Sequence, residues 1–114
     1  MSQIEILQAI ITERGRQDLI WGEQNHPLKS TKDSQTRYFQ EKADKAKKLC
    51  DDAANDGTLT WFHIYKEEFY EIFAEDDPSK QMKELIQHLA VGVAMAEYLQ
   101  RRFKISCEEL RSDV

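Results

Sequence analysis

Acidic and amide side chains recur at a spacing of three in the second half of the chain. Glu68 and Glu71 form one pair, and Glu84 and Gln87 form the second. Residues three apart lie on the same side of an α-helix, so each pair presents two oxygen-bearing side chains together. Ligand sets made of oxygen suit hard cations such as Mg²⁺ or Mn²⁺. The spacing therefore predicts a divalent-cation site shared by two helices.

The surroundings of the first pair strengthen this interpretation. On a helical wheel, Glu68 and Glu71 fall in the same arc as Trp61, Ile64 and Tyr65. A charged carboxylate on an apolar stripe is costly unless it is paired or coordinates a metal. Glutamates at this spacing are also common on solvated helix faces, so a purely structural role stays open as the alternative.

Four helical segments must position these residues. The apolar pattern, the capping residues and the positions of Gly57 and Pro78 set their limits. The expected ranges are Ile4 to about Leu19, a cap in residues 30–33 to about Asn55, a cap at Thr58 or Thr60 to about Glu75, and Pro78 to about Phe103. Short connections make sequential helices antiparallel neighbours. The sequence thus predicts an all-α protein, an antiparallel four-helix bundle forming a single domain over residues 1–114, with residues 104–114 as a frayed tail.

The second and fourth helices are expected to pack differently. The predicted buried stripe of the second helix consists mostly of small residues, which let a neighbouring helix approach closely. Its members are Phe39, Ala43, Ala46, Cys50 and Ala53. The fourth helix carries apolar residues on two faces and is predicted to be the most buried. This apolar surface exceeds the need of one monomer, so we expect a homodimer or a homotetramer.

Composition excludes several other classes. The 114 residues include 21 acids and 16 bases, a formal charge of −5, which argues against binding a nucleic acid polymer. The longest apolar stretch, Leu89 to Ala96, is too short to cross a membrane. Cys50 and Cys107 have no CxxC spacing and are expected to be reduced thiols, which favours a cytoplasmic location.

The order of these motifs resembles that of a known family. Glu67, Glu68 and Glu71, followed after twelve residues by Glu84, resemble the EExxE…ExxD signature of the MazG-like all-α nucleoside triphosphate pyrophosphohydrolases. The run ERGRQDLIWGEQNH at 13–26 and the run KELIQHLAVGVAMAEYL at 83–99 are similar to a phage and bacterial branch of that group. The resemblance implies a helical, usually oligomeric protein. It also implies that Mg²⁺ is used to cleave a nucleoside triphosphate between its α and β phosphates, which gives a monophosphate and pyrophosphate. Clearing of the nucleotide pool is the role that this reaction suggests.

Carried over residue by residue, the resemblance implies a set of catalytic and metal-binding positions. The metal ligands match Glu68, Glu71 and Glu84, and Glu67 is the neighbouring acid of the doubled glutamate, with an exposed or salt-bridged acid as its alternative. The fourth place departs from the signature, because Gln87 stands where the family has Asp. Gln87 offers one neutral oxygen, so it is expected to be a weak or water-mediated ligand.

The same resemblance suggests which residues contact the substrate. The phosphate candidates are Arg14, Arg16 and Gln17 on the first helix, and Arg37, Lys42 and Lys45 on the second. Trp21 and His26, in the loop after the first helix, could stack on or hydrogen-bond a base. Solvated lysines, a tryptophan that closes the end of the bundle and a histidine that caps the loop are the alternatives. We expect His63 and His88 to be surface or packing residues.

Two rival functions differ in how well they fit the sequence. A di-iron carboxylate bundle requires Glu-x-x-His on two helices, and this chain has Gln87 and Glu71 at the corresponding positions. A non-catalytic helical module that senses nucleotides or binds a protein remains the alternative, and Gln87 is its best support. Nothing in the sequence distinguishes one base or sugar from another.

Overall fold

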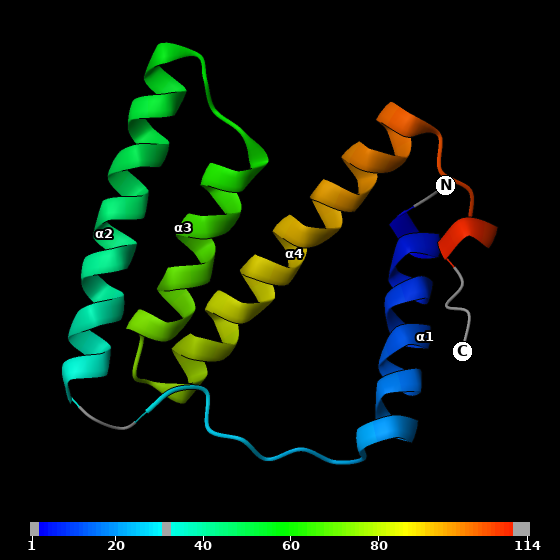
Figure 1. The fold of residues 1–114 in the computed structure, drawn as a ribbon, viewed down its shortest axis with the longest axis horizontal. Coiled ribbons are helices and arrows are strands. Elements are labelled where there is room, and N and C mark those ends of the chain that lie inside the picture. The colour runs from blue at the N-terminus through cyan, green and yellow to red at the C-terminus, as the bar shows by residue number, and fades with distance from the viewer. Residues whose placement is uncertain (1–2, 31–32, 111–114) are drawn as a thin grey trace. The chain divides into compact units, whose positions relative to one another are not determined.

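The computed structural model describes residues 3–30 and 33–110, which contain four α-helices and no strand (Figure 1). The helices are α1 (Gln3–Trp21), α2 (Asp33–Asp56), α3 (Trp61–Ala74) and α4 (Pro78–Phe103). Each predicted limit agrees with the observed one to within two residues, where the structure describes it. The predicted all-α class is confirmed, and the helices pack against one another.

Within the predicted tail, residues Glu108–Leu110 form a 3₁₀ turn, η1. The expected fraying of residues 104–114 stays a prediction. In the same region the Cys107 thiol donates a 2.5 Å hydrogen bond to Glu5 of α1. Residues 111–114 lie outside the described part of the chain.

The chain divides into two compact units. One comprises Pro27–Gly92, and the other comprises Met1–His26 together with Val93–Val114. Helices α2 and α3 and the first half of α4 belong to the first unit, whereas α1 and the second half of α4 belong to the second. Each unit is described by itself below.

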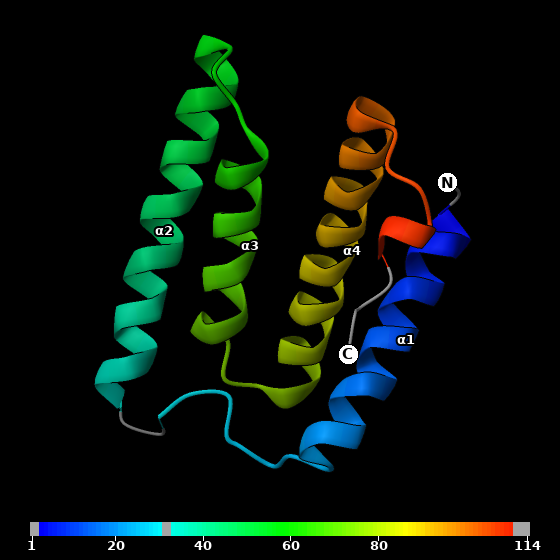
Figure 2. The same ribbon diagram turned by 45° about the vertical axis from the view of Figure 1, so that its right-hand side comes forward.

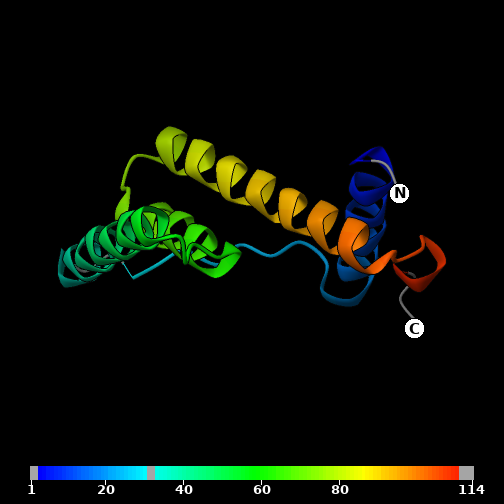
Figure 3. The same ribbon diagram turned by 90° about the horizontal axis from the view of Figure 1, so that it is seen from above.

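Helices α2 and α3 lie side by side and run in opposite directions, as Figures 2 and 3 show from two further directions. Ala43, Ala46 and Ala53 of α2 are only 4–5% exposed, and Ile72 of α3 is 3% exposed. The short alanine side chains let the two helices approach closely. The predicted small-residue stripe is therefore confirmed at these three alanines, while Phe39 and Cys50 are half-buried.

Local sequence explains why α2 ends and α3 begins where they do. Gly57 has a φ of +81°, a left-handed conformation that favours glycine, and Thr58 N then donates to Ala53 O at 2.9 Å. Thr60 caps α3 by accepting a hydrogen bond from His63 N, and Thr60 N donates to His63 Nδ1 at 3.0 Å. A histidine thus takes the place that glutamate or glutamine usually holds in a capping box.

Lys29 ties the loop before α2 to the turn between α3 and α4. Its ammonium group donates to the carbonyls of Phe73 and Glu75 and forms a 2.8 Å ion pair with Asp76. The side chain of Lys29 is only 10% exposed. The lysine therefore satisfies carbonyl groups that the end of α3 leaves without helical partners.

Burial along α4 differs from the prediction. His88 is its one buried residue among those described, whereas Met82, Ile86 and Leu89 are each more than half exposed. The prediction that α4 is the most buried helix is wrong for this chain, because α3 covers one side of the helix and leaves the apolar residues on another side in contact with solvent. None of the described helices is both long and apolar enough to cross a membrane.

Candidate functional site

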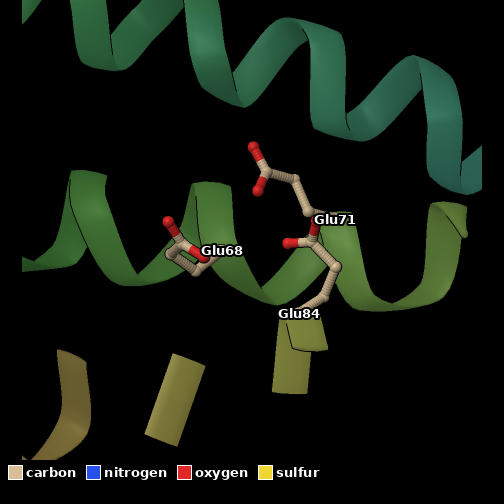
Figure 4. Close-up of side chains that lie close together, drawn as sticks. All are labelled: Glu68, Glu71 and Glu84. Carbon is tan, nitrogen blue, oxygen red and sulfur yellow. The ribbon is translucent and has the colours of Figure 1, made fainter. Parts of the chain in front are cut away.

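Three glutamates from two helices meet in the unit formed by residues 27–92. Glu68 and Glu71 project from α3, and Glu84 projects from the first turns of α4. One carboxylate oxygen of each lies within 4.8 Å of the others (Figure 4). The spacing of three on α3 and the short connection to α4 bring them together, as the sequence predicts. We call these residues the glutamate triad.

The carboxylates of the triad have few interactions that offset their burial. All three residues are half-buried, and Glu68 Oε2 and Glu84 Oε2 are buried oxygens without a hydrogen-bond partner in the described structure. A buried polar atom without a partner is energetically unfavourable, and such atoms are rare in folded proteins. The triad therefore has oxygen atoms available to a cation.

The pKa values of two triad members are raised because the carboxylates are partly buried together without a positive charge beside them. Burial, followed by repulsion from Glu68 and Glu84, raises the pKa of Glu71 to about 7. Burial and repulsion from Glu84 also raise the pKa of Glu68. Near neutral pH Glu71 can hold a proton, and its side chain is hydrogen-bonded to Glu84. A divalent cation could take the place of this proton and pair all three carboxylates.

Such a donor set has a defined chemistry. Three carboxylate oxygens are hard ligands and favour Mg²⁺ or Mn²⁺ over softer metals. They would leave other coordination positions to water or to phosphate oxygens, which is the arrangement found where Mg²⁺ binds through a few carboxylates plus a substrate. The three carboxylates therefore fit a hard divalent cation that keeps some coordination positions for other ligands.

Glu67 lies next to the triad in sequence but is engaged elsewhere. Burial and a hydrogen bond with Glu67 raise the pKa of the Cys50 thiol to about 11, so the Glu67 carboxylate reaches α2. Its charge still contributes to the raised pKa values of Glu68 and Glu71. The structure does not group Glu67 with the three carboxylates. Its contact with Cys50 differs from the exposed or salt-bridged position that was the alternative, and its catalytic role stays a prediction.

Gln87, the expected fourth ligand, is exposed on α4. It forms no hydrogen bond with any residue that the structure describes. The next residue, His88, is instead the buried one, at 8% exposed. One step along a helix turns the side chain by about 100°, so Gln87 and His88 face different surroundings.

His88 packs between α3 and α4. Its ring lies 3.9 Å from the ring of Tyr65, centre to centre, and burial lowers its pKa. The Tyr65 ring also passes close to Gly92, where an added Cβ would lie 3.4 Å from the hydroxyl oxygen. His88 is predicted to be a surface or packing residue, and the structure shows it in packing. The Tyr65 contact depends on two helices and has no signature in the sequence.

The candidate phosphate-binding residues of α1 pair with their own helix. Arg14 forms a 2.6 Å ion pair with Asp18 and donates to Gln17. Arg16 pairs with Glu13 at 2.5 Å, and Gln17 also donates to Glu13. All of them belong to the unit that does not contain the triad, so the described contacts do not bring them to the triad.

The remaining candidates for substrate binding also make no described contact with the glutamate triad. Lys42 is half-buried with its ammonium group 5.5 Å from the centre of the Tyr38 ring, and Lys45 is exposed. Trp21, at 57%, and His26 are exposed too. No described ion pair joins Lys42 or Lys45 to a triad carboxylate. Their roles stay predictions.

Comparison with known proteins gives no relative for this chain. No protein-family model, no curated protein and no solved structure matches it.

Proposed function

We propose that this protein is a Mg²⁺-dependent nucleoside triphosphate pyrophosphohydrolase, with Mn²⁺ as a possible substitute, and that the glutamate triad is its metal site. The observation that carries the proposal is the meeting of three half-buried carboxylates, two of them with an unpartnered buried oxygen. The likeness of the motif order to the MazG-like enzymes supplies the reaction. The bundle architecture and a cytoplasmic location belong to the same proposal.

Glu68, Glu71 and Glu84 would bind the cation, and the half-buried setting strengthens their attraction for it. The bound cation supplies neutralisation of phosphate charge and lowers the pKa of a coordinated water. Glu84 is the ligand supplied by α4, whereas Glu68 and Glu71 come from α3. The site therefore depends on the packing of these two helices. Gln87 would act through a water molecule, because its side chain is exposed beside the triad rather than within it.

Cationic side chains would contact the triphosphate. The Arg14–Asp18 pair is more than half exposed on both sides. Exposed ion pairs contribute only about 0–1 kcal/mol, so Arg14 can exchange Asp18 for a phosphate at little cost. Arg16, with Gln17 beside it, is held more firmly, because its pair with Glu13 is only 31% and 36% exposed, so exchange for a phosphate costs more there. Lys45 is already free of an ion pair in the described structure. Lys42, Trp21 and His26 complete the proposed substrate-binding set.

The direct test is a product assay. The protein is incubated with Mg²⁺ and a panel of ribonucleoside and deoxyribonucleoside triphosphates, and pyrophosphate and monophosphate are measured. We expect equal amounts of the two products from at least one substrate. A Glu68→Gln/Glu71→Gln variant should lose at least about 100-fold in rate, whereas Glu41→Gln, an exposed acid on α2, should keep the wild-type rate.

The alternative is a helical module that binds nucleotides without turnover, and the exposed position of Gln87 is the observation in its favour. In that case no substrate would release pyrophosphate above the level of the Glu68→Gln/Glu71→Gln variant. Calorimetric binding of a triphosphate in the same samples would then identify the module.

A further inference from the structure

An apolar stripe on α4 is exposed in this chain. Met82, Ile86 and Leu89 are 60%, 57% and 52% exposed. At 100° per residue they fall within about 60° of one another, so they share one side of the helix. Exposed large apolar side chains that share a helix face mark an interaction surface.

The stripe lies on a different side of α4 from the contacts with α3. Glu84, His88 and Gly92 face α3 through the triad and through Tyr65. The centre of that side is about 120° from the centre of the stripe. Packing of α3 against α4 therefore leaves the stripe uncovered, and a partner can reach it without disturbing the triad.

The spacing along α4 is that of a coiled-coil seam. Apolar residues alternate at intervals of four and three along the helix, as in the a and d positions of a heptad repeat. The positions are Met82, Ile86, Leu89, Val93, Ala96, Gln100 and Phe103, with Gln100 as the polar exception. A seam of this kind fits another helix that carries the same repeat.

A second copy of α4 in the antiparallel direction fits this seam. With the two-fold axis beside residues 90–91, Leu89 of one copy lies opposite Val93 of the other, and Ile86 lies opposite Ala96. The register that aligns these layers also places Lys83 beside Glu97 of the second copy, twice by symmetry. Among the described residues neither has an oppositely charged partner, although Glu97 accepts a 3.4 Å hydrogen bond from Gln3.

A parallel pair lacks this complementarity. Its flanking positions opposite Lys83 and Glu97 would be occupied by Pro78 and Gly92, which carry no charge. The charges on α4 therefore favour the antiparallel arrangement. Ala90, near the axis and exposed, is small enough to let the two backbones approach.

We propose that two copies of this protein associate through antiparallel packing of α4 on α4, along the seam from Met82 to Phe103, with reciprocal Lys83–Glu97 ion pairs. The proposal names the surface and the register of the expected homodimer. It does not rest on the proposed enzyme activity.

Charge reversal tests the register. Sedimentation equilibrium measures the dimer dissociation constant of the wild type, of Lys83→Glu, of Glu97→Lys and of the double variant. Each single reversal should weaken the dimer by about 5-fold or more, because it replaces two attractive pairs by two repulsive ones. The double variant should return to within about 2-fold of the wild type. Glu41→Lys on α2, which changes the net charge by the same amount as Glu97→Lys, should leave the dimer unchanged.

The apolar part of the seam has its own test. Ile86→Lys should raise the dissociation constant by at least about 100-fold while leaving the helical circular dichroism spectrum unchanged. A wild-type chain that is monomeric at tens of micromolar overturns the proposal. So does a dimer that is insensitive to Ile86→Lys, or one whose single charge reversals are not rescued by the double variant. A monomer whose melting point falls on Ile86→Lys would show that another part of the same chain covers the stripe.

Discussion

Glu71 is the triad member whose ionisation is most strongly opposed in the metal-free protein. Its pKa of about 7 lies well above the usual value because burial and two neighbouring carboxylates oppose its ionisation. The spacing of three in the sequence predicts that Glu68 and Glu71 share a helix face. It does not predict that Glu67 turns to Cys50, because that contact depends on how α2 lies against α3.

The raised pKa makes the metal-free protein sensitive to pH. Between about pH 4.5 and 7 the folded chain holds a proton on Glu71 that the unfolded chain releases. The free energy of unfolding should therefore fall as pH rises through this range, by roughly 1 kcal/mol after allowance for solvent screening, and then level off. Urea unfolding in the presence of a chelator at pH 5 and pH 8 measures the change.

The matched control is Glu71→Gln, which has no proton to lose. The fall between pH 5 and pH 8 should be smaller in this variant than in the wild type by about the stated amount. An identical fall in both proteins would contradict the assignment of the raised pKa to Glu71.

At the scale of the elements, the helix limits follow from local sequence, whereas contacts between distant segments do not. Thr60, Gly57 and Pro78 set helix limits by local geometry, so those limits could be predicted to within one or two residues. Lys29 could not be recognised in advance, because its partners at Phe73, Glu75 and Asp76 are more than forty residues away in sequence.

Lys29 should matter more than an ordinary surface lysine. Lys29→Met removes the ion pair with Asp76 and the donors to two carbonyls, at a cost of about 1–3 kcal/mol in the free energy of unfolding. Lys48→Met, which removes an exposed ion pair with Asp52, should cost less than about 1 kcal/mol. Equal costs in chemical denaturation would show that the Lys29 contacts do not hold the α3–α4 turn.

The alanine stripe of α2 should resist enlargement. Ala46, at 4% exposed, faces α3, so Ala46→Leu forces the two helices apart and should cost about 1–3 kcal/mol. Lys47→Leu, one position along and exposed, adds a similar side chain outside the contact and should be nearly neutral. Thermal unfolding of both variants compares them directly, and a neutral Ala46→Leu would contradict close packing of α2 on α3.

At the scale of the whole molecule, the helical class was accessible from composition and periodicity, whereas the distribution of burial was not. A wheel shows that α4 has two apolar sides, but it cannot say which side a neighbour covers. In the structure α3 takes the side of His88, and Met82, Ile86 and Leu89 stay exposed. No described side chain is completely buried, so much of the apolar surface that the sequence assigns to a core is open to association.

The central claim is that the glutamate triad binds a divalent cation. Titration with Mn²⁺ at pH 8, followed by the electron paramagnetic resonance signal of the free ion, measures this binding without reference to any reaction. We expect saturable binding by the wild type, competition by Mg²⁺, and at least about a 100-fold loss of affinity in Glu68→Gln/Glu71→Gln with unchanged affinity in Glu41→Gln. Equal Mn²⁺ binding by the wild type and the Glu68→Gln/Glu71→Gln variant, or no saturable binding by either, would contradict the claim.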